Sequence, residues 1–401
     1  MPLNIDNTKT EMAIPPILRL AFRPLFLLGT LFSVITIGWW VHFWSAPFQW
    51  APYGGVLWWH GHEMLFGFGV AIVTGFLLTA VKTWTSVPGI RGKWLAGLVL
   101  TWVSGRLLIS FSSGINDWLI ASVDIAYLVL SAIAMAYPVF KVKQWRNLMF
   151  VPILLTLAGL NVISHWAVNT NQPVLAMHSL HATIMLFTLI ISILGGRVIP
   201  AFTANTTGQK KATPIMGLEI VSILSILSMI TIAFIGFDRV DPKWLSTIAL
   251  ITAITNGIRF MRWGIQHTGS IPLLWSLHLS YIFIPLGFAL ISLNAAGLMN
   301  NISAALHSFT IGAIGGMILA MISRVTLGHT GRPLKAHPMI NWGFVSIIVA
   351  TLVRVVLPTW LPEYYSLSIS LAGILWILAF GLFLIFYTPM LVKKRADGQI
   401  G

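Results

Sequence analysis

The sequence predicts an all-α integral membrane protein, a single domain of twelve transmembrane helices over residues 1–401. Three observations support this fold class: the composition, the recurrence of long apolar runs, and the placement of the basic residues. Of the 401 residues, 57% are hydrophobic and only 8% are charged, whereas soluble globular chains carry about 25% charged residues. The mean hydropathy of +0.86 agrees with a membrane protein. No stretch is polar enough to form a soluble domain.

Apolar runs of about 20 residues, the length that crosses the core of a bilayer, follow one another along the chain. A polar segment at 1–19 precedes them, and a basic tail at 392–401 follows. Similar helices recur at intervals of four, which suggests a threefold quasi-repeat of four-helix arcs. The predicted spans are 20–44, 60–81, 94–113, 117–140, 147–168, 174–199, 215–236, 243–263, 272–296, 301–323, 339–360 and 365–391.

The basic residues test this count and orient the helices. Of the 24 Lys and Arg residues, Arg239 and Lys243 fall in a loop on one side, and Arg106 and Arg354 fall inside spans. Every other basic residue falls on the opposite side, in a loop, in a terminus or near the end of a span. Loops rich in Lys and Arg face the cytoplasm, so both termini are predicted to be cytoplasmic. The net charge of +14 is then an orientation signal that fits anionic lipid rather than nucleic acid.

Histidines gather near the outer ends of several predicted helices. Three of these helices, the second, sixth and tenth, carry His60, His62, His178, His181 and His307. His165 extends this layer from the fifth helix, although a lone interfacial histidine is the commoner explanation for it. Imidazole suits copper, iron and zinc, and the chain has no cysteine, so the layer predicts a metal or haem site. On the inner side, His278 and His329 leave open whether a second cofactor binds.

Four further ionisable residues fall within the predicted bilayer region. Glu63 lies in the segment WWHGHEM, and an ionisable group inside a membrane usually marks function. We therefore expect Glu63 to be a catalytic group that relays protons. Arg106 and Asp124 lie at similar depth and could form an ion pair. Alternatively, Arg106 and Arg354 hold carboxylates such as haem propionates, because a guanidinium binds a carboxylate through two hydrogen bonds.

Several segments resemble the NnrS family of bacterial membrane proteins. The segments are LAFRPLFLLG, WWHGHEMLFGFGVAIVTGFLLTAV, GGRVIPAFT, LLWSLHLSYIFIPLGF and ALHSFTIGAIGGMILAMISRVTLGHTGRP. The resemblance implies a haem- and copper-containing protein of the bacterial cytoplasmic membrane, linked to nitric oxide metabolism, nitrosative-stress protection and denitrification. The family's motif histidines fall on His60, His62, His278, His307 and His329, with His165 a looser match. His178 and His181 lie outside this pattern.

A more distant likeness concerns architecture alone. Haem–copper oxidases and nitric oxide reductases also use a bundle of twelve helices in three arcs, with ligands on the second, sixth and tenth helices. The paired histidines that those proteins carry on their seventh helix have no counterpart here, because the predicted span 215–236 contains no histidine. Any relationship to that superfamily is therefore remote.

Together these observations lead to one main hypothesis, a membrane protein that handles nitric oxide with a b-type haem bound by His62 and His307. Glu63 relays protons, and Arg106 and Arg354 hold the propionates. Copper or a second metal uses a subset of His60, His165, His178 and His181. Reduction of nitric oxide consumes electrons and protons, so an oxidoreductase resembling nitric oxide reductases requires a quinol or an electron-donor protein.

Whether the protein is an enzyme stays open at this point, because a site without an electron donor would only bind or sense nitric oxide. One alternative is a transporter of a metal, haem or a nitrogen-oxide species, since twelve helices with an internal repeat are typical of transporters. Another is a haem-binding assembly or repair factor without turnover of its own.

Overall fold

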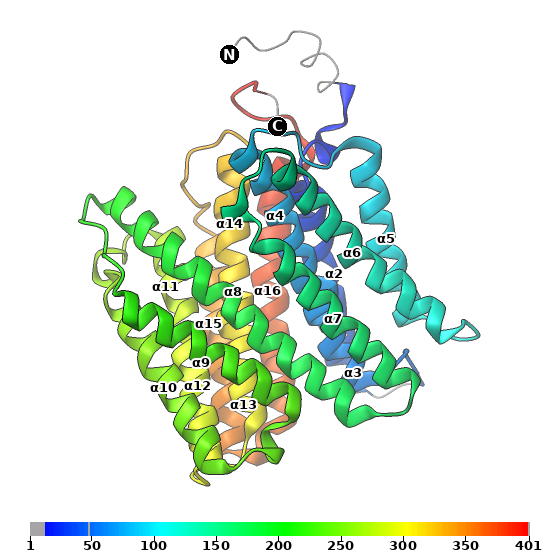
Figure 1. The fold of residues 1–401 in the computed structure, drawn as a ribbon, viewed down its shortest axis with the longest axis vertical. Helices are drawn as coiled ribbons and strands as arrows, with labels where there is room; N and C mark the ends of the chain where they lie inside the picture. Colours follow the sequence, from blue (N-terminus) through cyan, green and yellow to red (C-terminus); the bar gives the residue numbers. More distant parts are fainter. Residues whose placement is uncertain (1–12, 47–48, 400–401) are drawn as a thin grey trace.

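The computed structural model describes residues 13–46 and 49–399, and in this part of the chain all regular structure is helical. The predicted polar segment at 1–19 therefore lies largely outside the described residues, as do 400–401 of the predicted tail. Twelve long helical segments run up and down through the molecule (Figure 1). Eleven are long and apolar enough to cross a membrane. The twelfth, α5 (Gly92–Ser110), has 19 residues and is more polar because it contains Lys93 and Arg106.

Each predicted span coincides with one helical segment, so the prediction of twelve helices is confirmed. Some segments consist of two or three consecutive helical stretches. In chain order the other eleven are α2 (Phe22–Ser45), α3–η2–α4 (Val56–His62, Glu63–Gly69, Val70–Thr85), α6 (Asp117–Lys141), α7 (Phe150–Asn169), α8 (Pro173–Thr207), α9 (Met216–Ile235), α10 (Pro242–Met261), α11–α12 (Pro272–Tyr281, Phe283–Ala295), α13–η6–α14 (Ile302–His307, Ser308–Gly315, Gly316–His329), α15 (Ile340–Trp360) and α16 (Tyr365–Val392).

The sixth and tenth segments are longer than predicted. The helix α8 continues through Pro200 and ends at Gly208, whose positive φ of 72° closes the helix in the left-handed conformation that glycine adopts readily. The helix α14 continues to His329. Arg197 and Pro200 interrupt the sixth apolar run and Arg324 interrupts the tenth, but both helices continue through these residues.

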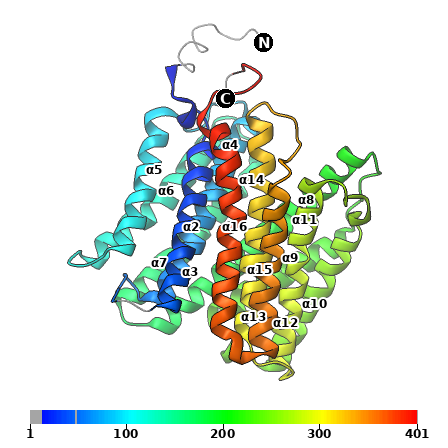
Figure 2. The same cartoon turned by 180° about the vertical axis from the view of Figure 1, so that it is seen from behind.

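The second, sixth and tenth segments form the centre of the bundle. In their most hydrophobic stretches, 78%, 67% and 72% of the residues are buried inside the protein, against 61% or less in the other candidate spans. The helix α8 contacts both η2 and η6, so the sixth segment joins the second and the tenth. In Figures 1 and 2, α14 likewise lies among the other helices rather than at the edge. Central helices at intervals of four agree with the predicted quasi-repeat.

Two of the central segments share an unusual local geometry. The helix α3 ends at His62 and α13 ends at His307, and each continues directly into a π-helical stretch, η2 or η6. Such wider turns occur mostly at functional sites. Glycines permit close packing here, because a Cβ on Gly312 would overlap the ring of Phe283 and one on Gly67 would lie 2.7 Å from a ring carbon of Phe32.

A buried ion pair lies at the end of α10. Arg259, which the sequence places near the cytoplasmic end of the predicted span 243–263, lies in the last turn of α10 and is only 2% exposed. Its Nη2 donates to Oε2 of Glu219 on α9 at 2.8 Å, and its Nη1 donates to the hydroxyl oxygens of Ser192 at 2.5 Å and Tyr281 at 2.8 Å. These partners come from three other helices, α8, α9 and α11, and they hold the guanidinium inside the bundle.

Candidate functional site

A cavity of about 380 Å³ lies in the half of the bundle remote from the carboxyl end of α16. Helices α2, α3, α8, α13, α15 and α16 all contribute side chains to its wall, together with η2 and η6. Most of the lining is apolar and aromatic, which is typical of sites for small molecules and cofactors. The ionisable and imidazole side chains of the lining are His60, His181, His307 and Arg354.

His60 and His307 reach this cavity from the second and tenth segments. The His60 ring stacks on Trp40 with centroids 4.1 Å apart and planes 12° apart, and its buried Nδ1 has no hydrogen-bond partner. The His307 Nδ1 lies 2.7 Å from the carbonyl oxygen of Ser303, so Nδ1–H donates to that oxygen. Donation from Nδ1 leaves the lone pair on Nε2, which is the tautomer of a metal-binding histidine.

Arg354 on α15 supplies the cavity with a buried cation. The side chain is 5% exposed, and among the described residues its Nη1 has no hydrogen-bond partner. Its Nη2 donates over long distances, 3.4 Å to the Ser303 hydroxyl and 3.3 Å to the Tyr365 hydroxyl. In the described part of the chain no carboxylate pairs with Arg354. A buried guanidinium without a counter-charge is costly, so this side chain favours an anionic ligand in the cavity.

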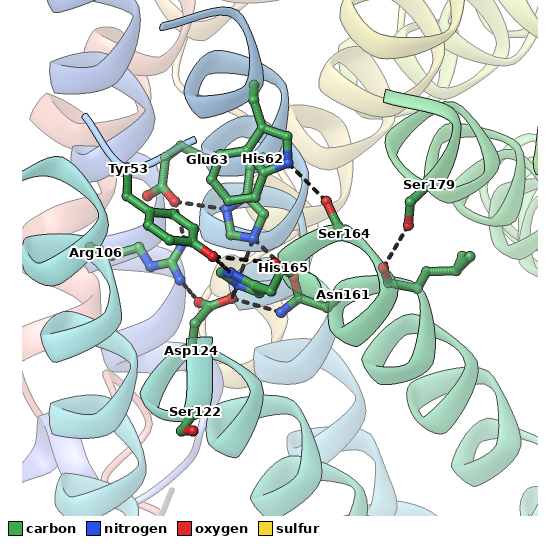
Figure 3. Close-up of polar contacts among 12 residues, drawn as sticks. Tyr53, His62, Glu63, Arg106, Ser122, Asp124, Asn161, Ser164, His165 and Ser179 are labelled. Atoms are coloured by element: carbon green, nitrogen blue, oxygen red, sulfur yellow. Dashed lines mark hydrogen bonds and ion pairs between the residues drawn. The ribbon is translucent and has the colours of Figure 1, made fainter. Parts of the chain in front are cut away.

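Beside the cavity, three side chains from three helices bring their donor atoms together, as Figure 3 shows. His62, Asp124 and His165 each offer one ligand atom, and these atoms lie within 4.8 Å of one another. The Asp124 Oδ2 is 3.3 Å from His62 Nε2 and 3.0 Å from His165 Nε2. Two imidazoles and a carboxylate form a donor set that first-row transition metals accept.

The other ring nitrogen of each histidine has a partner of its own. The Nδ1 of His62 lies 2.9 Å from Glu63 Oε1, and the Nδ1 of His165 lies 3.1 Å from the Tyr53 hydroxyl (Figure 3). Partners at the far nitrogen fix the orientation of metal-binding histidines in known sites. The Asn161 amide donates to Asp124 Oδ2 at 2.6 Å and fixes the carboxylate. This cluster is therefore organised around the point where the three donor atoms meet.

Arg106 joins the two carboxylates of the cluster. Its Nη1 donates to Glu63 Oε1 at 2.7 Å, and its Nη2 forms an ion pair with Asp124. All three side chains are at most 4% exposed, and the ion pair between Arg106 and Asp124 is the one that their matching depth in the sequence suggests. Two ionised carboxylates and one guanidinium leave one negative charge uncompensated. The cluster therefore favours an added cation, which a proton or a metal ion supplies.

The structure divides the predicted outer histidine layer between two sites. His60, His181 and His307 line the cavity, whereas His62 and His165 belong to the polar cluster. His62 and His307 are thus not brought together around one space. The pair on the sixth segment is also divided, because His181 lines the cavity and His178 does not. The carboxylate oxygen nearest to the Nε2 of His178 belongs to Asp238 and lies 4.0 Å away.

The two inner histidines lie in separate surroundings. The Nε2 of His278 is 3.0 Å from the Thr203 hydroxyl, and the His278 ring packs near Phe260. The His329 ring instead packs against Phe22 at the end of α14. These contact partners differ completely, so the described structure gives the pair no common site.

Sequence reasoning overlooked three residues of the polar cluster. The sequence indicates Asp124 only as a partner of Arg106, and it indicates neither Asn161 nor Tyr53. Asn161 precedes His165 by one helical turn on α7, a spacing that places both on one face. Tyr53 lies in the loop before α3, and its sequence neighbourhood holds no signal of a site.

Comparison with known proteins finds a family model that matches the chain nearly from end to end. The family model described as NnrS protein matches residues 16–395. No curated protein matches the chain. The matched region contains all twelve helical segments, the cavity and the polar cluster. The chain therefore belongs to the NnrS family.

Proposed function

We propose that this NnrS-family membrane protein handles nitric oxide through a b-type haem held in the cavity between His60 and His307. The family is generally linked to nitric oxide responses, and membership suggests haem and metal binding. The observation that supports the proposal best is the cavity lining. It combines imidazoles from two different central segments with an arginine that has no counter-charge.

The residues present match the needs of a haem. His307 has its lone pair on Nε2, and the Nδ1 of His60 has no protein partner, so both rings have a nitrogen free to bind iron. Arg354 would bind a propionate through its unpartnered Nη1. His60 thus replaces His62 as the proposed partner of His307. When bound, a haem iron would supply a site that binds nitric oxide and exchanges one electron at a time.

A second metal, which the family resemblance suggests is copper, has its best donor set in His62, Asp124 and His165. The three ligand atoms lie together, and mixed nitrogen and oxygen donors suit Cu²⁺. Glu63 and Arg106 would balance the charge of this site. A role for Glu63 in proton relay stays part of the proposal, because its Oε2 is buried without a partner. His178 and His181 lack a comparable third donor.

The test is to purify the protein from membranes that supply its native cofactors, quantify haem, and record spectra of the reduced form with nitric oxide. We expect a Soret band that shifts when nitric oxide is added. The variants His60→Ala and His307→Ala should lose haem, while His62→Ala and the exposed control His267→Ala should retain it. Protein saturated with native cofactors but free of haem would contradict the proposal.

Turnover of nitric oxide decides between an oxidoreductase and a haem protein that only binds, assembles or repairs. Steady-state consumption of nitric oxide by the purified protein with an electron donor would support the enzyme.

A transporter is the second candidate, favoured by the interruption between α11 and α12 and by the two π-helical stretches, since broken helices are common in transporters. Transport of a metal, haem or nitrite into proteoliposomes by protein that contains no haem would favour the transporter.

For the location, we propose the bacterial cytoplasmic membrane with both termini in the cytoplasm. The positive-inside distribution of Lys and Arg supports this orientation. It places the cavity and the polar cluster in the outer half of the membrane. Nitric oxide would then reach the cavity from the bilayer or from the outer face.

A further inference from the structure

A second hollow, a groove of about 240 Å³, lies between α2 and α5. Its mouth opens sideways toward the surface that faces the bilayer, where Ile35 and Leu107 are 54% and 55% exposed. Its inner wall is aromatic and includes Phe32, Trp59 and Trp102. The volume is below the lower end of about 300 Å³ for drug-sized ligands, so the groove suits a single ring rather than a large cofactor.

The walls of the groove are fixed before any ligand binds. The indole N–H of Trp50 donates to the Ser110 carbonyl oxygen and that of Trp59 to the Ser110 hydroxyl, both at 3.1 Å. The indole N–H of Trp102 donates to the Gly67 carbonyl oxygen at 2.9 Å. Three tryptophans are thereby held in place with their polar atoms satisfied. A ligand ring would meet flat, rigid apolar surfaces at low cost in entropy.

Two buried hydrogen-bond donors of the lining have no partner within residues 13–46 and 49–399. The Thr36 hydroxyl and the Arg106 Nε–H both belong to residues that line the groove, and these residues are 1% and 4% exposed. A threonine hydroxyl inside a helix usually bonds to a carbonyl oxygen one turn earlier, so an unbonded Thr36 is unusual. Leaving such groups unsatisfied in an apolar region is costly. An acyl chain offers no hydrogen-bond acceptor to these two donors, whereas a ring that carries oxygen atoms does.

We propose that this groove binds the head group of a membrane quinone or quinol. The oxygen atoms of the ring would accept hydrogen bonds from Thr36 and Arg106, and the isoprenoid tail would leave between Ile35 and Leu107 into the lipid. A quinone head group is flat, apolar at its faces and polar at two edges, and the groove has the complementary walls and donors. The lateral opening matches a ligand that arrives through the bilayer.

The position of Arg106 connects the groove to the proposed metal centres. Arg106 lines the groove, and its Nη atoms bind Glu63 and Asp124 of the polar cluster. The electron-donor role rests on the proposed haem function. Oxidation of one quinol breaks two O–H bonds, releases two protons to water, and delivers two electrons that convert two equivalents of ferric haem to ferrous haem. Quinone binding itself does not depend on the haem.

The first experiment measures binding of decylubiquinone to the purified full-length protein by titration calorimetry in detergent micelles. We expect saturable binding with one site per chain. Thr36→Val removes one hydrogen bond and should weaken binding about tenfold. Ile35→Trp fills the mouth from an exposed position and should weaken it further. Thr101→Val on α5 is the matched control, because its hydroxyl already bonds to the Gly97 carbonyl oxygen at 3.0 Å, and it should bind as the wild type does.

The second experiment adds decylubiquinol to the ferric protein and follows reduction of the haem spectrum. Reduction in the wild type that slows in Thr36→Val and Ile35→Trp would support the groove as the site of electron delivery. Unsaturable binding, or equal affinity in Thr36→Val and the wild type, would identify a lipid groove and overturn the proposal. Saturable binding without haem reduction would overturn the electron-donor role. Absence of haem would contradict the proposed function, while the binding result would still decide the quinone site.

Discussion

His60 and His62 are separated by one residue of α3 and face two different sites. Two residues along an α-helix correspond to a rotation of about 200°, so the two rings point in nearly opposite directions. His60 stacks on Trp40 in the cavity, and His62 stacks on Trp58, with centroids 4.3 Å apart, in the polar cluster. One short helix therefore supplies a ligand candidate to each of two neighbouring sites.

Arg106 should be essential for stability because it holds two buried carboxylates. Removal of one partner from a buried ion pair typically costs about 3–5 kcal/mol, so Arg106→Met should lower the free energy of unfolding by about that amount. Denaturant unfolding in a mild detergent measures this change. Arg239→Met, at an exposed position, is the control and should unfold as the wild type does. An Arg106→Met protein as stable as the control would show that the ion pair contributes little.

The proposed copper site makes a graded prediction for metal content. His165→Ala and Asp124→Asn should lose the non-haem metal, because each removes one of the three donor atoms. Tyr53→Phe keeps the donors and removes only the hydroxyl at His165 Nδ1, so metal affinity should fall by about 10–100-fold. Metal analysis by mass spectrometry, with haem measured in parallel, checks these outcomes. Equal metal content in wild type and His165→Ala would rule out this donor set.

Gly312 should be sensitive to the smallest possible substitution. A methyl group there would overlap the Phe283 ring, and overpacking of this kind costs about 1–3 kcal/mol. We expect a lower melting temperature for Gly312→Ala and partial recovery when Phe283→Leu is added. Gly381→Ala on α16 is the control, because nothing lies within 4 Å of its added methyl group. A melting temperature unchanged by Gly312→Ala would contradict the close packing.

The docked C-terminal tail should respond to acid. Hydrogen bonds from the Arg395 guanidinium lower the pKa of Asp397 to about 2, below the value of about 3.9 for the unfolded chain. A lowered folded-state pKa stabilises the docked tail above about pH 4, and this contribution is lost as the pH falls toward 2. Carboxyl carbon NMR of labelled aspartate should report a midpoint near 2 for Asp397.

The control for this titration is Arg395→Met, which should return the Asp397 midpoint to about 3.9. The tail is held at the end of α14, where the Ala396 amide donates to the Thr330 carbonyl oxygen at 3.0 Å and Arg395 donates to the His329 carbonyl oxygen at 3.2 Å. An Asp397 midpoint that is the same in both proteins would show that Arg395 does not set it.

The proposed orientation can be tested by labelling single cysteines, because the chain has none of its own. Arg239→Cys and Lys210→Cys replace exposed residues in loops predicted to lie on opposite sides. A membrane-impermeant maleimide should label Arg239→Cys in intact cells and Lys210→Cys only after permeabilisation. The reverse pattern would invert the orientation and place the cavity toward the cytoplasm.

The sequence by itself determined the membrane class, the number of helices and most of their limits. These features follow from the length and composition of local segments, which the bilayer selects directly. The angular separation of His60 and His62 and the pairing of Arg106 with Asp124 were also predictable, because helix periodicity and depth are properties of the chain itself.

Only the tertiary structure decided which side chains share a site. His60 lines the cavity with His307, while His62 contacts Asp124 and His165, because the packing of the four helices α3, α6, α7 and α13 sets these neighbourhoods. Packing between helices also buries Arg259 and forms the groove at Thr36. Helix contacts distant in sequence are set by shape complementarity along whole helix surfaces, and no local pattern of residues encodes that information.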